Sequence, residues 1–184
     1  SVVGGKLTTW RRMGEDTMNF IARRDCKKVS SVTRAMQLDG TEGWPLSSPD
    51  DESSTSSYDD DILAHLGRSY GANMREVLAI ANSEPRLARR IVLDLPCLMA
   101  EIVYACRHEM AATIDDVLTR RTRIALLDKD QGLDAVRDVA AVMAAEIGWD
   151  SAEVDCQIAA YQEIVRTDYR EAQPTSPQPT SASR

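Results

Sequence analysis

The sequence predicts a mainly α-helical protein. Aromatic residues make up only 5% of the 184 residues, with a single Phe. Such a composition favours helices over a β-sandwich. Between residues 59 and 170, apolar side chains recur at helical spacing, and no segment there alternates as a half-buried strand would. The length allows one packed domain, or one domain plus a piece of another.

Six helices are expected in this region, each from an apolar stripe bounded by capping or breaking residues. Asp59 begins the first, and Gly71 ends it. The third follows Pro96 and should carry Glu101 and Glu109 on its flanks. The other expected helices begin near Asn73, Thr113, Leu133 and Asp150.

The charge pattern indicates a boundary before these helices. Residues 1–34 carry a net charge of +5, and residues 35–61 carry −8. Residues 47–57 are acidic and Ser-rich, which predicts a surface loop, and residues 173–184 are Pro-rich, which predicts a disordered tail. We therefore expect four parts: an N-terminal segment (1–24), a connection (25–58), an all-helical domain (59–170) and the tail (171–184).

Several classes of protein and of site are disfavoured. The net charge of −7 argues against nucleic acid as a partner. No apolar run approaches the ~20 residues needed to cross a bilayer. Cys26, Cys97, Cys106 and Cys156 form no CxxC pair, and only His65 and His108 could join them, so we expect reduced cysteines and no metal site. Residues 128–132 begin like an EF-hand loop, but their glycine falls at the wrong position.

The first 24 residues follow a different pattern. Val2 and Val3 are typical of the end of a buried strand, and Gly4 and Gly5 permit a sharp turn. A helix follows, with Trp10 expected in a core. This arrangement would place backbone N–H groups, the positive end of the helix and the Lys6 ammonium at one point, which favours an anionic or electron-rich ligand atom.

Longer motifs resemble one family. The string GGKLTTWRRMGED (4–16) closely resembles the last flavin-contacting segment of FAD-dependent glycerol-3-phosphate dehydrogenases, with Gly14 where the family usually has Ala. Three later segments also resemble that family, in the same order: residues 96–111, the string DVLTRRTR (116–123) and residues 143–149. The resemblance implies that residues 1–24 finish a Rossmann-like FAD-binding domain and that residues 59–170 form the helical C-terminal bundle, or cap.

The resemblance also implies a site. Gly4, Gly5, Lys6, Leu7 and Thr8 would contact FAD, and Lys6 would also bind glycerol 3-phosphate. No residue of this chain is assigned a catalytic role, because the family's remaining site residues belong to an upstream FAD domain. For Arg120, Arg121 and Arg123, we favour pairing with Asp115, Asp116 or Glu109, although a substrate-phosphate site remains an alternative.

The implied function is the oxidation of sn-glycerol 3-phosphate to dihydroxyacetone phosphate, with FAD accepting the hydride and passing electrons to quinone. Since the chain has no Met at position 1, we expect a C-terminal fragment that is inactive alone. Oxygen as the acceptor, as in glycerophosphate oxidases, is one alternative, and a stand-alone helical interaction module without catalysis is another. The resemblance implies a cytoplasmic protein and leaves open a homodimer and peripheral contact with the inner face of the membrane.

Overall fold

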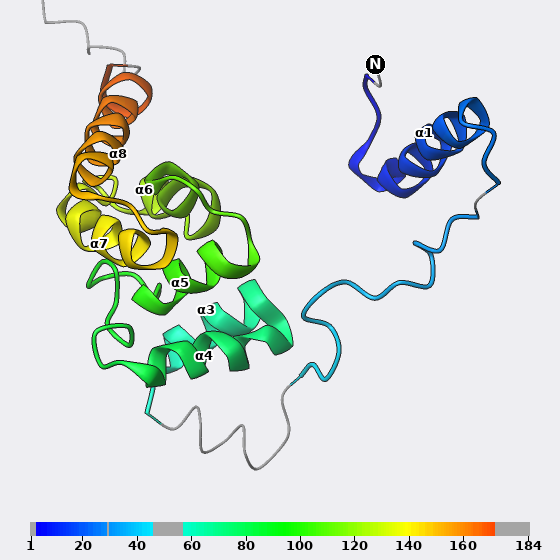
Figure 1. The fold of residues 1–184 in the computed structure, drawn as a ribbon. Helices are drawn as coiled ribbons and strands as arrows, with labels where there is room; N and C mark the ends of the chain where they lie inside the picture. Colours follow the sequence, from blue (N-terminus) through cyan, green and yellow to red (C-terminus); the bar gives the residue numbers. More distant parts are fainter. Residues whose placement is uncertain (1–2, 29, 46–56, 172–184) are drawn as a thin grey trace, which may run out of the picture. The chain divides into compact units, whose positions relative to one another are not determined.

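The computed structural model describes residues 3–28, 30–45 and 57–171 and divides into two compact units, Ser1–Glu42 and Gly43–Arg184 (Figure 1). We call them the N-terminal unit and the helical unit. All regular elements among the described residues are helices, and an isolated bridge joins Arg90 and Leu98. The predicted mainly α-helical class is therefore confirmed. The predicted loop (47–57) and tail (171–184) fall almost wholly outside the described residues.

The N-terminal unit contains helix α1 (Trp10–Arg24), which continues from a 3₁₀ turn (Leu7–Thr9). Val3 is 91% exposed and belongs to no strand, while the rest of the predicted strand end lies outside the described residues. Trp10 is 51% exposed, so the prediction that it is a core residue is wrong for this unit. The reason is that α1 is the one regular α-helix among the unit's described residues, and an apolar helix face needs a second element to cover it.

The helical unit begins with two helices that match the predicted pattern. Helix α3 (Asp60–Tyr70) follows Asp59 and ends at Gly71, whose φ of 58° suits a residue without a side chain. Helix α4 (Met74–Ser83) ends two residues before Pro85. The helix start predicted near Asn73 is confirmed, but the Asn73 side chain does not cap the helix: a 3₁₀ turn (Gly71–Asn73) leads directly into α4, and the Asn73 amide donates to the Tyr104 hydroxyl (3.2 Å).

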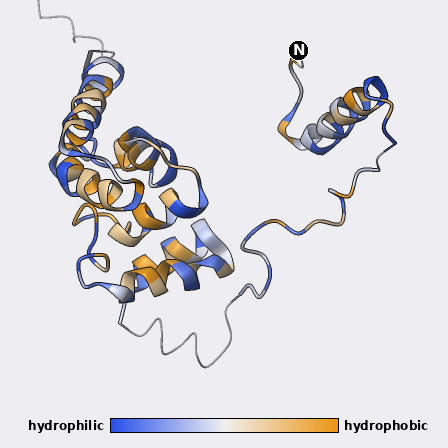
Figure 2. Cartoon of the chain, viewed as in Figure 1, coloured by the Kyte–Doolittle hydropathy of each residue, from blue (hydrophilic) through white to orange (hydrophobic). Residues whose placement is uncertain are grey.

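Helix α5 (Met99–His108) lies at the centre of the unit and packs against α4 and α7 (Val136–Ile147). Every residue from Met99 to Ala105 is buried, including Glu101, which is 1% exposed. The prediction that Glu101 lies on a flank is therefore wrong. Apolar and hydrophilic residues alternate along α4, whereas α5 is mostly apolar up to its last turn (Figure 2).

The remaining helices complete the bundle. A π-helix (Asp116–Arg121) and the short α6 (Ile124–Leu127) follow α5, and a 3₁₀ turn (Leu133–Ala135) precedes α7. Helix α8 (Ser151–Ile164) packs against α7 and continues as a π-helix (Val165–Glu171). The start predicted at Asp150 is confirmed, because its carboxylate accepts the Glu153 N–H at 2.8 Å.

Candidate functional site

The turn that precedes α1 is an exposed stretch of backbone. Gly4 and Gly5 have φ values of 82° and 113°, which L side chains rarely adopt. A Cβ atom on Gly5 would also collide with the Met13 sulfur, whereas a Cβ on Gly4 would meet open space. Residues 3–8 are all exposed. The two glycines therefore allow a turn that α1 supports from one side and that leaves main-chain groups accessible.

Lys6 lies where the turn becomes helical. Its carbonyl accepts the Thr9 N–H (2.9 Å) and the Thr9 hydroxyl (2.8 Å), which fixes the first turn. No acidic residue occupies the first turn of the 3₁₀ segment or of α1. Among the described residues, Lys6 forms no ion pair. The positive end of the helix and the Lys6 ammonium therefore remain available to an anionic group.

A groove of about 660 Å³ lies beside this turn within the N-terminal unit. Its lining is rich in hydroxyl and guanidinium groups and consists of Thr8, Thr9, Arg11, Arg12, Glu15, Ser31, Thr33 and Arg34. The Arg11 guanidinium donates to the Thr33 carbonyl and stacks over the Trp10 ring, 4.4 Å from its centroid. Hydroxyls and guanidinium groups together suit a phosphate or another anion.

Two arginines of the motif in the helical unit, Arg120 and Arg121, pair with carboxylates, as predicted. The side chain of Arg120 pairs with those of Asp115 and Asp116. Arg121 lies 3.3 Å from a Glu109 carboxylate oxygen and donates to the Glu109 carbonyl (2.6 Å). Arg123 is exposed and adopts a left-handed φ of 59°. These contacts tie the π-helix to the end of α5 and to its own first turn.

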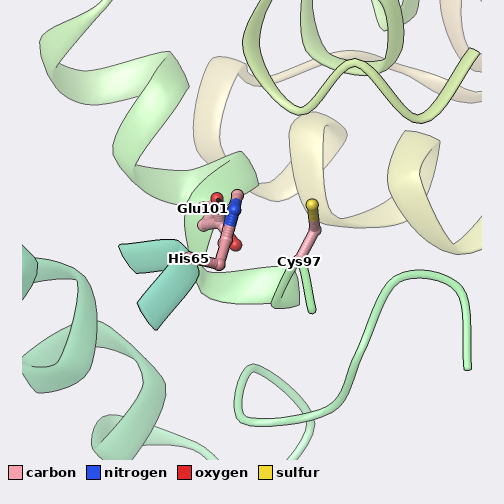
Figure 3. Close-up of side chains that lie close together, drawn as sticks. All are labelled: His65, Cys97 and Glu101. Carbon is pink, nitrogen blue, oxygen red and sulfur yellow. Dashed lines mark hydrogen bonds and ion pairs between the residues drawn. The ribbon is translucent and has the colours of Figure 1, made fainter. Parts of the chain in front are cut away.

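The helical unit contains a buried polar cluster that the sequence did not predict. Glu101 accepts hydrogen bonds from His65 Nε2 (2.8 Å), the Tyr70 hydroxyl (2.9 Å) and the Leu98 N–H (2.7 Å). The Cys97 sulfur belongs to the same cluster, within 4.8 Å of a His65 nitrogen and a Glu101 oxygen (Figure 3). In the sequence, Glu101 falls among the apolar positions of its helix. A charged residue in such a position could have indicated a buried, hydrogen-bonded carboxylate.

The cluster perturbs its own titratable groups. Burial raises the pKa of the Cys97 thiol well above its usual range, the negative charge of Glu101 raises it further, and Arg90 opposes both effects. Burial also raises the pKa of Tyr70, and Glu101 adds to the shift through its charge and its hydrogen bond. At neutral pH both groups therefore keep their protons, and the Tyr70 hydroxyl donates to Glu101.

The fold and the site define the class of this chain: an α-helical domain that follows a glycine turn and a helix. Residues 31–154 match the family described as the C-terminal domain of alpha-glycerophosphate oxidase. The match covers more than half of the chain, so the chain belongs to this family.

The relatives agree with that assignment. The chain is 34% identical over 172 residues to the glycerol-3-phosphate dehydrogenase of Synechocystis sp. and 30% identical over 183 residues to the mitochondrial glycerol-3-phosphate dehydrogenase SDP6 of Arabidopsis thaliana. The alignments cover 90% and 91% of this chain but only 30% and 29% of the relatives. This chain thus spans about 30% of their length.

A solved structure shares the fold. The crystal structure of the glycerol-3-phosphate dehydrogenase of Bacillus halodurans, complexed with FAD, superposes with a TM-score of 0.70 and 27% identity. The superposition covers 89% of this chain and 34% of that protein. The resemblance inferred from the motifs is therefore confirmed.

Proposed function

We propose that this chain is the C-terminal part of a flavoenzyme that oxidises sn-glycerol 3-phosphate to dihydroxyacetone phosphate. Residues 1–24 would complete the FAD-binding domain, residues 25–58 would link it to the next domain, and residues 59–170 would form the helical cap. The observation that carries the proposal is the turn before α1, where two glycines with positive φ lead into Lys6 and an uncompensated helix start.

The turn fits an electron-rich cofactor edge. When bound, FAD would supply the acceptor for the hydride that leaves C2 of the substrate. Gly4 and Gly5 would let the main chain approach the ring closely, because neither carries a side chain. Leu7 and Thr8 would present the start of the helix, whose positive end favours negative charge. None of these residues needs to transfer a proton, so no residue of the chain is proposed as catalytic.

Lys6 would bind the substrate phosphate as well as the cofactor edge. Its ammonium is exposed, has no carboxylate partner among the described residues and lies at the helix start. The neighbouring groove adds Arg11 and Arg34, whose guanidinium groups favour anions. Arg12 in the same lining already pairs with Asp16 (3.1 Å) and Glu15 (3.8 Å). A substrate that carries a phosphate matches this excess of positive charge.

The electron acceptor we propose is quinone. Oxygen is the second candidate, because the matched family is described by a glycerophosphate oxidase. The two are distinguished by assaying the parent flavoenzyme for quinone reduction and for hydrogen peroxide production. Peroxide formed in stoichiometric amounts with the oxidised substrate would favour the oxidase.

We also propose a cytoplasmic enzyme that contacts the membrane peripherally and forms a homodimer. No helix among the described residues is long and apolar enough to span a bilayer. The basic stretch 11–34 supports contact with anionic lipids. Co-sedimentation of the parent protein with anionic but not neutral vesicles tests the contact, and analytical ultracentrifugation tests the dimer.

The role of Lys6 is tested in the parent flavoenzyme with Lys6→Ala and, as a matched control, Lys28→Ala. Both changes remove one exposed lysine of the N-terminal unit. We expect Lys6→Ala to lower kcat/KM at least tenfold, since a charge-assisted contact to phosphate is worth about 1.5–3 kcal/mol. Lys28→Ala should stay within twofold of wild type. Equal effects of the two changes would refute the assignment.

A further inference from the structure

The buried cluster in the helical unit combines three different metal-binding groups. An imidazole nitrogen of His65, the Cys97 sulfur and a carboxylate oxygen of Glu101 all lie within 4.8 Å of one another. His65 lies in α3, Cys97 precedes α5, and Glu101 lies in the first turn of α5. Figure 3 shows the His65 ring alongside Glu101, with Cys97 next to the pair. The fold thus brings together ligands that lie 32 and 36 residues apart in the sequence.

The charge around the cluster favours a cation. Glu101 is 1% exposed, and of its three described hydrogen-bond donors only His65 can be positively charged. Arg90 is the cation that acts on Cys97, but its guanidinium is bound to Asp59 (2.9 Å) and Asp61 (2.8 Å). A buried carboxylate is costly without a compensating charge. A divalent cation would compensate both this carboxylate and a Cys97 thiolate.

We propose that His65, Cys97 and Glu101 bind one Zn²⁺ ion, with water as a fourth ligand. Imidazole, thiolate and carboxylate are ligands of zinc, whereas Ca²⁺ and Mg²⁺ select sites made of oxygen alone. On binding, the Cys97 thiol loses its proton to solvent and the sulfur lone pair bonds the metal. The ring proton of His65 moves from Nε2, where it is donated to Glu101 in the metal-free cluster, to Nδ1, and the freed Nε2 lone pair bonds the metal.

Only small movements are needed to form the site. Tetrahedral zinc ligands lie about 3.3–3.8 Å apart. His65 Nε2 and Glu101 Oε2 are 2.8 Å apart, so this pair opens slightly, while Cys97 closes from at most 4.8 Å. The His65 side chain is 18% exposed, which gives the ion and its water a route from solvent.

The surrounding groups already orient the ligands. The Leu98 N–H and the Tyr70 hydroxyl hold the two carboxylate oxygens of Glu101, which is the usual task of groups behind a metal ligand. The Cys97 thiol donates to the Thr122 carbonyl (3.8 Å), and this weak hydrogen bond is exchanged for the metal bond when the thiol loses its proton. An ion here would join α3 to α5 and stabilise the helical unit.

The test is a Co²⁺ titration of the 184-residue chain, followed by displacement with Zn²⁺. The other three cysteines (Cys26, Cys106 and Cys156) are changed to Ser, so that any thiolate signal comes from Cys97. We expect one Co²⁺ per chain, a near-ultraviolet thiolate-to-Co²⁺ charge-transfer band and the strong visible bands of a tetrahedral site. Saturation with Zn²⁺ at about 100-fold over its Kd should raise the Tm by roughly 5–10 °C.

Ligand variants decide the outcome. Cys97→Ser, His65→Gln and Glu101→Gln should each weaken Co²⁺ binding at least tenfold and remove or alter the thiolate band. His108→Gln is the matched control, because His108 also pairs with a glutamate, Glu76, at 3.1 Å but belongs to no comparable cluster within the described part of the chain. Circular dichroism of each metal-free variant verifies that it folds. The absence of a thiolate band in a folded chain, or its retention in Cys97→Ser, would overturn the proposal.

Discussion

Removal of the Glu101 carboxylate should weaken the helical unit more than removal of any partly exposed acidic side chain. In Glu101→Ala, the buried Leu98 N–H and the Tyr70 hydroxyl both lose their acceptor. Each unsatisfied buried donor costs about 1–3 kcal/mol, and the lost side chain leaves a cavity as well. We therefore expect the free energy of unfolding to fall by about 3–5 kcal/mol.

Urea denaturation of the 184-residue chain, followed by circular dichroism in the presence of a chelator, measures this loss. Glu101→Gln keeps an oxygen for the Leu98 N–H, so it should cost only about 1–2 kcal/mol. Glu109→Ala is the control, since Glu109 is partly exposed and pairs with Arg121, and it should cost about 1 kcal/mol or less. A loss below 1 kcal/mol in Glu101→Ala would refute the reasoning.

Three further predictions follow from the described contacts. Arg121→Ala should lower the Tm by about 2–4 °C, because the change breaks the contacts with Glu109. An unchanged melting curve, together with lost substrate binding in the parent enzyme, would instead favour a phosphate site at Arg121. Burial alone would raise the pKa of Asp116, but hydrogen bonds from the Ala112 and Thr113 N–H groups and the Thr113 hydroxyl, together with Arg120, hold it below its usual range. The contribution of the Asp116 carboxylate to stability is therefore complete above about pH 4–5 and is lost as the pH falls through its folded-state pKa. Asp116→Asn should be less stable than wild type at pH 7, but it should lose less stability than wild type between pH 5 and pH 2. Urea denaturation midpoints at each pH measure this difference. In the parent enzyme, Gly5→Ala should lower flavin occupancy at least tenfold, because the Gly5 φ is positive and the added Cβ would collide with Met13. Gly14→Ala is the control: its added Cβ would meet open space, so this variant should bind flavin as wild type does. Equal flavin occupancy in the two variants would contradict the proposed turn.

The helices were predictable because their signals are local. Asp59 and Gly71 bound α3, Pro85 follows α4, and Gly148 ends α7 with a φ of 80°. Thr113 and Asp116 exchange hydrogen bonds of 2.9–3.1 Å at the helix start predicted near Thr113. Capping depends on residues three or four apart, so the sequence carries most of this information.

The errors concern contacts made across the fold. Asn is a residue type that often caps helices, but the side-chain amide of Asn73 donates to the hydroxyl of Tyr104, 31 residues away. Glu101 has the charge of a surface residue, yet His65 and Tyr70 reach it from α3. Trp10 matches a core pattern, but among the described residues of the N-terminal unit no other regular α-helix covers α1. Such outcomes depend on which elements meet, and helical periodicity does not specify that.

The central claim is that the parent protein is a flavoenzyme that oxidises glycerol 3-phosphate. The most direct measurement is the absorbance of its bound flavin under anaerobic conditions on addition of sn-glycerol 3-phosphate. The proposed function predicts bleaching of the oxidised flavin band, with one equivalent of dihydroxyacetone phosphate formed per flavin reduced. A flavin that stays oxidised with this substrate, in a folded parent protein, would contradict the proposal.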